Sequence, residues 1–180
     1  MLLTALMSHA FAADLSPWVG EWGLDPAASD DPYEKLQQAI GVPLLSGGAA
    51  RGLAPDGGAD DREEQQRRLV SITTRLLALS GRIGLAPTEA ADLSITYGGE
   101  PSLDVTLGRK WHKVKREDNV IRLRASAQDN LVVERRVKSA VLTETFLAPV
   151  EPGVLYAVVR VDGSGVDGLE FRRVYRALHE

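Results

Sequence analysis

The sequence predicts a mainly β protein in which eight or nine antiparallel strands form an up-and-down meander barrel. From Asp92 onward, apolar residues alternate with polar ones, which is the periodicity of strands with one buried face. Turn-like segments separate these runs at intervals of about ten residues. A meander of this length is expected to close, because an open sheet would leave two long edges unpaired.

The composition is that of one globular domain without cysteine chemistry. The chain has 180 residues, 44 % of them hydrophobic, and a net charge of −4. The absence of cysteine excludes disulfides, thiolate metal sites and a cysteine nucleophile. The histidines, His9, His112 and His179, are too scattered for a histidine-rich metal centre, so neither a metal nor a cofactor is expected.

The first strand is predicted at Leu15–Leu24, where Trp18 and Trp22 are its bulkiest members and Pro26 ends it. A short helix is predicted over 27–40. Asp30 or Asp31 is suited to its N-cap, and Pro32 to its first helical position.

A second helix is predicted to begin at Asp61, after a loop rich in Gly, Ala, Pro and Asp. Gly84 is expected to end this helix. The apolar residues within it recur at spacings of three and four and are Leu69, Ile72, Leu76, Leu79 and Ile83. The segment 26–90 is therefore interpreted as a helical and loop insertion after the first strand.

The other strands follow from alternation and turn residues. They are predicted at 93–97, 103–107, 110–116, 120–127, 131–137, 141–148, 154–161 and 169–178. All of 13–180 is expected to form one domain.

Residues 1–12 are predicted to be the last part of a secretory signal peptide. Leu2 to Met7 is a short apolar run, and Ala10-Phe11-Ala12 is a small-x-small cleavage signal. An exported, periplasmic protein is therefore expected. The alternative is the mildly apolar N-terminus of a cytosolic protein, because no basic residue precedes Lys35.

Gly20-Glu21-Trp22 resembles the Gly-x-Trp signature of lipocalin-type barrels. In that family the tryptophan closes one end of the barrel, and a basic residue of the last strand packs over it. The resemblance implies this role for Trp22, with Arg172, Arg173 or Arg176 as its cation–π partner. The segments Trp22 to Pro32 and Phe171 to Tyr175 also resemble those of uncharacterised exported proteins of Gram-negative bacteria.

The densest basic run is 109–116, within a segment, 106–138, that holds ten bases and four acids. Trp111 lies inside this run and is expected to face the core while the cations face water. If the run from Arg109 to Arg116 has a partner, an anionic envelope surface fits better than nucleic acid, because the protein as a whole is acidic.

Catalysis is not favoured by the sequence. His112 is the one histidine in the folded body, and no Gly-x-Ser-x-Gly elbow or phosphate-binding loop is present. Paired acids such as Asp30–Asp31 and Asp60–Asp61 lie where helix caps are needed.

Two functions of different kinds remain. The first is non-catalytic binding of a small apolar or amphiphilic molecule in or at the mouth of the barrel, with Tyr97, Trp111, Phe146 and Tyr156 as candidate lining. The second is an interaction protein of the envelope with a filled barrel and a charged docking face. An enzyme that uses His112 is a weaker third alternative.

Overall fold

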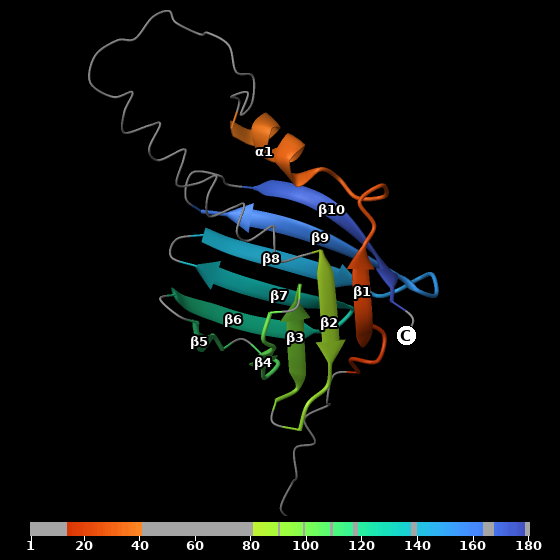
Figure 1. Cartoon of the computed structure of the whole chain (residues 1–180). Helices are drawn as coiled ribbons and strands as arrows, with labels where there is room; N and C mark the ends of the chain where they lie inside the picture. Colours follow the sequence, from red (N-terminus) through yellow and green to blue (C-terminus); the bar gives the residue numbers. More distant parts are fainter. Residues whose placement is uncertain are drawn as a thin grey trace, which may run out of the picture.

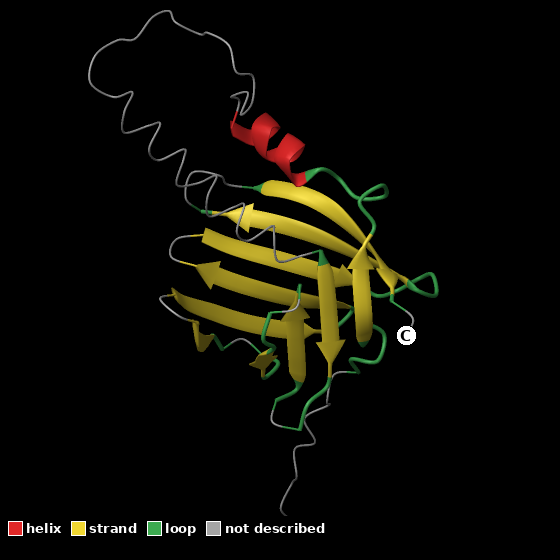
Figure 2. Cartoon of the chain, viewed as in Figure 1, coloured by secondary structure: helices red, strands yellow, loops and turns green. Residues whose placement is uncertain are grey.

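A computed structural model describes residues 14–40, 81–89, 91–98, 100–108, 110–116, 119–137, 140–163 and 168–178. These residues form a single ten-stranded antiparallel sheet that curls into a nearly closed barrel, with one described helix beside β10 (Figures 1 and 2). No helix in these ranges is long and apolar enough to cross a membrane.

Across the sheet, the strands lie in the order β4-β3-β2-β1-β10-β9-β8-β7-β6-β5. The elements are numbered in the order in which they occur along the chain. Their bounds are β1 Gly20–Leu24, α1 Pro32–Ile40, β2 Arg82–Ala86, β3 Leu93–Tyr97, β4 Leu103–Val105, β5 His112–Arg116, β6 Asn119–Ala127, β7 Asn130–Val137, β8 Ala140–Leu147, β9 Val154–Asp162 and β10 Leu169–Ala177.

Two different contacts complete the ring. The first and last strands pair directly, with Trp22 opposite Ala177 and Leu24 opposite Tyr175. By contrast, β4 and β5 are consecutive in the chain but are the two edges of the sheet. A single parallel bridge between Leu107 and Ala125 spans this seam, and the amide of Gly108 donates to the carbonyl of Ala125 at 2.8 Å.

The predicted barrel is confirmed as a mainly β antiparallel meander, but its strand count is ten. The additional strand is β2. Ile83 and Gly84, predicted to end the second helix, lie in β2 and pair with Trp22 and Glu21 of β1. The predicted insertion 26–90 is therefore too long, because it contains a strand of the barrel. The first strand is also shorter than predicted, since residues 16–18 form a turn.

The short helix is confirmed as α1. The Asp31 carboxylate accepts from the amide of Tyr33 at 2.8 Å, as an N-cap does, and Pro32 is the first helical residue. Leu36 is fully buried. The remainder of the second predicted helix, the Asp60–Asp61 pair and the predicted signal peptide lie outside the described residues.

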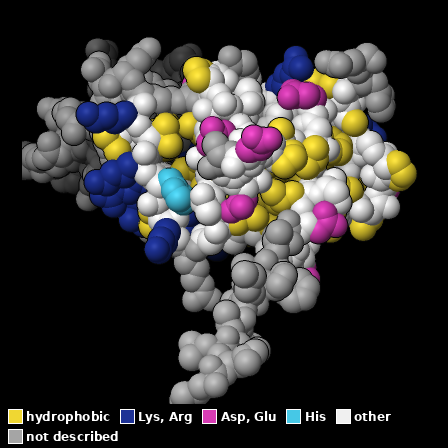
Figure 3. Space-filling view, turned by 90° about the horizontal axis from the view of Figure 1, so that it is seen from below, with side chains coloured by type: hydrophobic (Ala, Val, Ile, Leu, Met, Phe, Trp, Pro, Cys, Tyr) yellow, Lys and Arg dark blue, Asp and Glu magenta, His cyan; other side chains and the backbone are white. Residues whose placement is uncertain are grey.

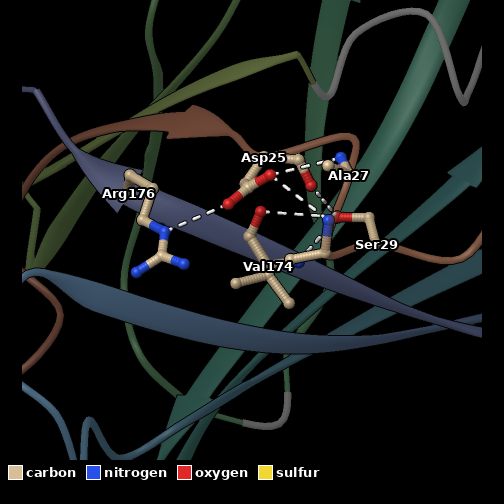
Figure 4. A network of polar contacts seen from close by, with 6 residues as sticks. Asp25, Ala27, Ser29, Val174 and Arg176 are labelled. Carbon is tan, nitrogen blue, oxygen red and sulfur yellow. Dashed lines mark hydrogen bonds and ion pairs between the residues drawn. The ribbon is translucent and has the colours of Figure 1, made fainter.

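The loop from Asp25 to Asp31 lies beside the part of β10 that extends beyond the end of β1 (Figure 4). Strand β1 is too short to pair with this part. The Asp25 amide donates to the Val174 carbonyl at 2.8 Å, and the Val174 amide donates to the Ser29 hydroxyl at 2.9 Å. Asp30 exchanges two further hydrogen bonds with the backbone of Arg172. The Arg176 guanidinium also donates to Asp25 at 3.1 Å. These contacts satisfy backbone groups that would otherwise form an exposed edge.

Inward side chains form two apolar clusters inside the barrel. The larger cluster includes Trp18, Trp22, Tyr97 and Phe146 and extends around most of the strands. The second lies at the end covered by α1 and consists of Leu36, Ala140, Leu142, Val159, Val161, Leu169 and Phe171. We call these the large cluster and the helix-side cluster.

We expect Ser29→Ala to destabilise the protein by about 1–2 kcal/mol, because the Val174 amide would lose its acceptor. Urea unfolding would measure the change. Ser102→Ala is the matched control, since Ser102 is exposed and outside the regular strands. Equal midpoints for the two variants would contradict the edge-covering role of Ser29.

Candidate functional site

A layer of polar side chains crosses the barrel between the two apolar clusters. Arg135 on β7, Glu144 on β8 and Arg173 on β10 are exposed by only 2 %, 0 % and 3 %. Buried charged side chains are rare unless they are paired, so this layer is the most unusual chemical feature of the described interior. We call Arg135, Glu144 and Arg173, with Tyr97 and Tyr175, the inner polar layer.

Strand alternation places these charges on the inward face. On β8 the buried positions are Ala140, Leu142, Glu144 and Phe146, so Glu144 lies between members of the helix-side and large clusters. Arg173 occupies the same position on β10, between Phe171 and Tyr175. The layer is therefore enclosed by apolar side chains along the barrel axis.

Hydrogen bonds across the barrel centre on the Glu144 carboxylate. The Tyr97 hydroxyl donates to Glu144 Oε2 at 2.7 Å, and Arg135 Nη2 donates to the same oxygen at 3.0 Å. The Arg135 guanidinium also stacks on the Tyr97 ring, 4.0 Å from its centroid. Because β3 and β8 are not neighbours in the sheet, the Tyr97–Glu144 bond joins opposite walls.

Arg173 and Tyr175 extend the layer along β10. Arg173 Nη1 donates to the Tyr175 hydroxyl at 3.4 Å, and its guanidinium lies 5.3 Å from the centroid of the Phe171 ring. The alternation of β10 thus brings a second guanidinium and a second phenol into the interior.

Some buried polar atoms of the layer have no hydrogen-bond partner among the described residues. They include Arg135 Nε, a donor, and Glu144 Oε1, an acceptor. An unsatisfied buried polar atom costs about 1–3 kcal/mol, and more when the group is charged. Such atoms in a native interior are candidates for contact with a bound water or ligand.

Burial controls the protonation of the layer. It raises the pKa of Tyr97 well above the ordinary value, and the negative charge of Glu144 raises it further. Burial also raises the pKa of Tyr175. For Arg135 burial lowers the pKa, but the Glu144 carboxylate together with Tyr97 and Tyr175 more than offsets this effect, and the net pKa is raised. The phenols therefore stay neutral donors and Arg135 stays charged.

Four aromatic residues were predicted to line a ligand site, and the structure brings two of them inside. Tyr97 belongs to the inner polar layer and Phe146 is fully buried in the large cluster. Tyr156 is half-buried at an outward position of β9, between the inward Leu155 and Ala157.

Trp111 also lies outside the interior, which corrects the expectation that it faces the core. It is half-buried, and its ring contacts the guanidinium groups of Arg124 and Arg136 at 4.5 and 5.1 Å from its centroid. Both arginines project from the outer face of the sheet.

The structure buries Trp22, and its predicted closure of one barrel end by a cation–π contact stays a prediction. Trp22 is 6 % exposed, and its indole N–H donates to the Trp18 carbonyl at 2.9 Å. Gly20 adopts a φ of 144°, which favours glycine over residues with a side chain. Arg176 pairs with Asp25, Arg172 is exposed on the outer face, and Arg173 stacks on Phe171.

His112 is the residue on which the enzymatic alternative depends. It lies half-buried on the edge strand β5, and no described carboxylate is within hydrogen-bond distance of it. Within the same described ranges, no group of three or more His, Asp or Glu side chains could hold a metal ion.

Arg135 and Glu144 were not among the predicted site residues, although the sequence contains a signal for them. In β7 the inward positions are Leu131, Val133, Arg135 and Val137, so a charge interrupts an apolar series. Glu144 interrupts the corresponding series in β8. A charged residue at an inward strand position was the available signal.

The described strands share their nearly closed β-barrel fold with a solved structure. An SAHS (secretary abundant heat soluble) protein from Ramazzottius varieornatus is similar, with a TM-score of 0.53, 13 % identity and coverage of 90 % of this chain and 96 % of that one. At this identity the likeness shows a shared fold.

Two further solved structures have lower similarity. A structure described as the REP1-NXSQ fatty acid transporter has a TM-score of 0.48 and 10 % identity, covering 92 % of this chain and 98 % of its own. The fluorescent protein UnaG has a TM-score of 0.48 and 12 % identity, with coverage of 91 % and 99 %. No protein-family model matches the sequence, and no curated protein does.

We expect Tyr97→Phe to destabilise the protein by about 2 kcal/mol, because the Glu144 carboxylate would lose a donor inside the barrel. Tyr33→Phe is the matched control, since Tyr33 is 48 % exposed on α1. Urea unfolding at neutral pH would compare them. A loss no larger than that of the control would show that the bond contributes nothing to stability.

Alkaline pH should destabilise the fold through the buried phenols. The pKa values of Tyr97 and Tyr175 are higher in the folded chain than when unfolded. The unfolded chain therefore releases these protons first, and the stability present below about pH 10 declines by up to about 1.4 kcal/mol per pH unit for each phenol. Urea unfolding from pH 8 to 11 should show a smaller decline for Tyr97→Phe than for the wild type. Identical slopes would contradict this role of Tyr97.

Proposed function

We propose that the barrel binds one small amphiphilic molecule in its interior, with the polar end of the molecule at the inner polar layer. The observation that carries this proposal is the pair of unsatisfied atoms, Arg135 Nε and Glu144 Oε1, buried between two apolar clusters. Apolar surroundings with a few convergent polar groups are typical of small-molecule sites.

The free-energy cost of burying Arg135 and Glu144 also favours a role for the inner polar layer in binding. Replacement of a buried ion pair by apolar side chains is often neutral or stabilising, so the pair is not needed to hold a barrel together. Arg135 and Glu144 nevertheless have side chains that are only 3 % and 1 % exposed. A ligand that completes their hydrogen bonds would offset part of the cost of burying them.

The two unsatisfied atoms define the polar end of the ligand. Arg135 Nε needs an acceptor and Glu144 Oε1 needs a donor. A hydroxyl, a carboxylic acid or a primary amide offers both. The apolar remainder would contact the surrounding cluster side chains.

Export to the periplasm is retained as part of the proposal on the basis of residues 1–12. Non-covalent mass spectrometry of the protein purified from its own host would test the binding function directly. We expect a mass above that of the chain, which falls to the chain mass after denaturation. Bare chain alone in fresh preparations would contradict an occupied interior.

Affinity for a series of ligands with one chain length would test the position of the polar end. We expect the alcohol and the carboxylic acid to bind about tenfold more tightly than the alkane, because only these two complete hydrogen bonds in the inner polar layer. Calorimetric titration should show that Glu144→Gln reduces this preference. Arg172→Gln is the control, since Arg172 is exposed on the outer face. A preference unchanged by Glu144→Gln would place the polar end elsewhere.

A further inference from the structure

The outer face of β5, β6 and β7 carries a row of cations. Strand register places Lys113 opposite Arg122, and Arg122 opposite Arg136, so three cations from three strands lie side by side. We call these residues, together with Lys115 and Arg124, the basic face. Lys113, Lys115, Arg122 and Arg136 are exposed.

This positive charge is not neutralised by the described chain. Glu134 is the one acidic residue in β5, β6 and β7, and it is held by Arg124 in a two-point contact. Neither Lys113 nor Arg122 forms an ion pair with a described acid. Like charges directly opposite each other destabilise a sheet, so the arrangement has a cost that an anionic partner would relieve.

Trp111 organises part of the basic face. Its ring contacts the guanidinium groups of both Arg124 and Arg136. These contacts restrict the two arginines, which reduces the entropy lost when they bind a partner. They also leave the indole ring occupied, so it is not free to stack on a nucleic-acid base.

The basic face differs sharply from the rest of the protein. The chain as a whole has a net charge of −4, so the positive charge is local and would orient the molecule toward an anionic surface. Figure 3 shows most of the Lys and Arg side chains of the displayed face at one end, beside a histidine. Acidic side chains lie nearer the middle and the opposite end, where some further Lys and Arg side chains are also seen.

We propose that the basic face docks the protein onto a bilayer that contains anionic lipids. An open sheet surface with cations on neighbouring strands presents charges in an extended array, which matches many phosphate groups rather than one bound ion. Val120 lies opposite Lys115 on this face and is 48 % exposed, which provides an apolar contact at the lipid interface. This inference does not depend on a ligand inside the barrel.

Structure also redefines the basic run predicted from sequence. Of residues 109–116, Lys113 and Lys115 are outward on β5, while Arg109 lies outside the described residues. The other residues of the basic face, Arg122, Arg124 and Arg136, come from β6 and β7. The proposed surface is therefore a product of strand pairing rather than of one basic segment.

Vesicle co-sedimentation with the full chain tests the proposal. With phosphatidylcholine vesicles that contain about 30 % phosphatidylglycerol, we expect binding that falls as salt is raised. The double variant Lys113→Gln with Arg122→Gln should reduce the partition coefficient about 25-fold, since each cation near an anionic surface contributes about fivefold. The matched control, Arg82→Gln with Arg172→Gln, removes the same charge from β2 and β10 and should bind as the wild type does.

Three results would overturn the proposal. They are equal binding to pure phosphatidylcholine vesicles, an equal loss in the control variant, and retention of the wild-type partition coefficient in the basic-face variant. Selective binding to a single-stranded oligonucleotide instead of vesicles would reassign the surface to nucleic acid. Urea unfolding of both variants confirms that any loss of binding does not come from unfolding.

Discussion

The pairing of the first strand with the last is the contact on which the whole barrel depends. Without the ladder from Trp22–Ala177 to Leu24–Tyr175, β1–β4 and β5–β10 would be two separate sheets joined by a seam with one bridge. The loop from Asp25 to Asp31 lengthens this connection along β10. The segment from Trp22 to Pro32 therefore contacts the segment from Phe171 to Tyr175 along this connection.

The barrel closed in this way encloses the inner polar layer. Apolar clusters lie on both sides of Arg135 and Glu144, so the charges are removed from water while Tyr97 joins them from the opposite wall. Burial of these charges lowers the free energy of unfolding, and in the proposed complex the same charges select a ligand by its polar group. The basic face has the same character on the outside, since it too keeps like charges close together where uncharged side chains would fit the strands better.

Alternation predicted most of the fold because a barrel has one buried and one exposed face on nearly every strand. It failed at β2, where Ile83 continued the helical spacing of the preceding apolar residues and Gly84 matched a helix stop. In the structure Gly84 lies opposite Glu21, whose carboxylate occupies the space that a side chain would need. The site was harder to predict. Tyr97 and Phe146 were identified as aromatic residues, but the meeting of Tyr97, Arg135 and Glu144 depends on the curvature that brings β3 to β8. No local pattern encodes that curvature.

Because β4 and β5 do not pair with each other, the same barrel can be built from a chain that connects its strands in a different order. Leu178 donates its amide to the Glu21 carbonyl, so the beginning of β1 and the end of β10 lie at one place. If the chain were joined there and opened between β4 and β5, the strands would follow one another as they do in the sheet, from β5 through β10 and β1 to β4. Every ladder would then connect neighbours in sequence, and the long loop closure now required by the β1–β10 ladder would disappear. Such a circular permutant would have a lower contact order, and it is expected to fold faster into the same barrel.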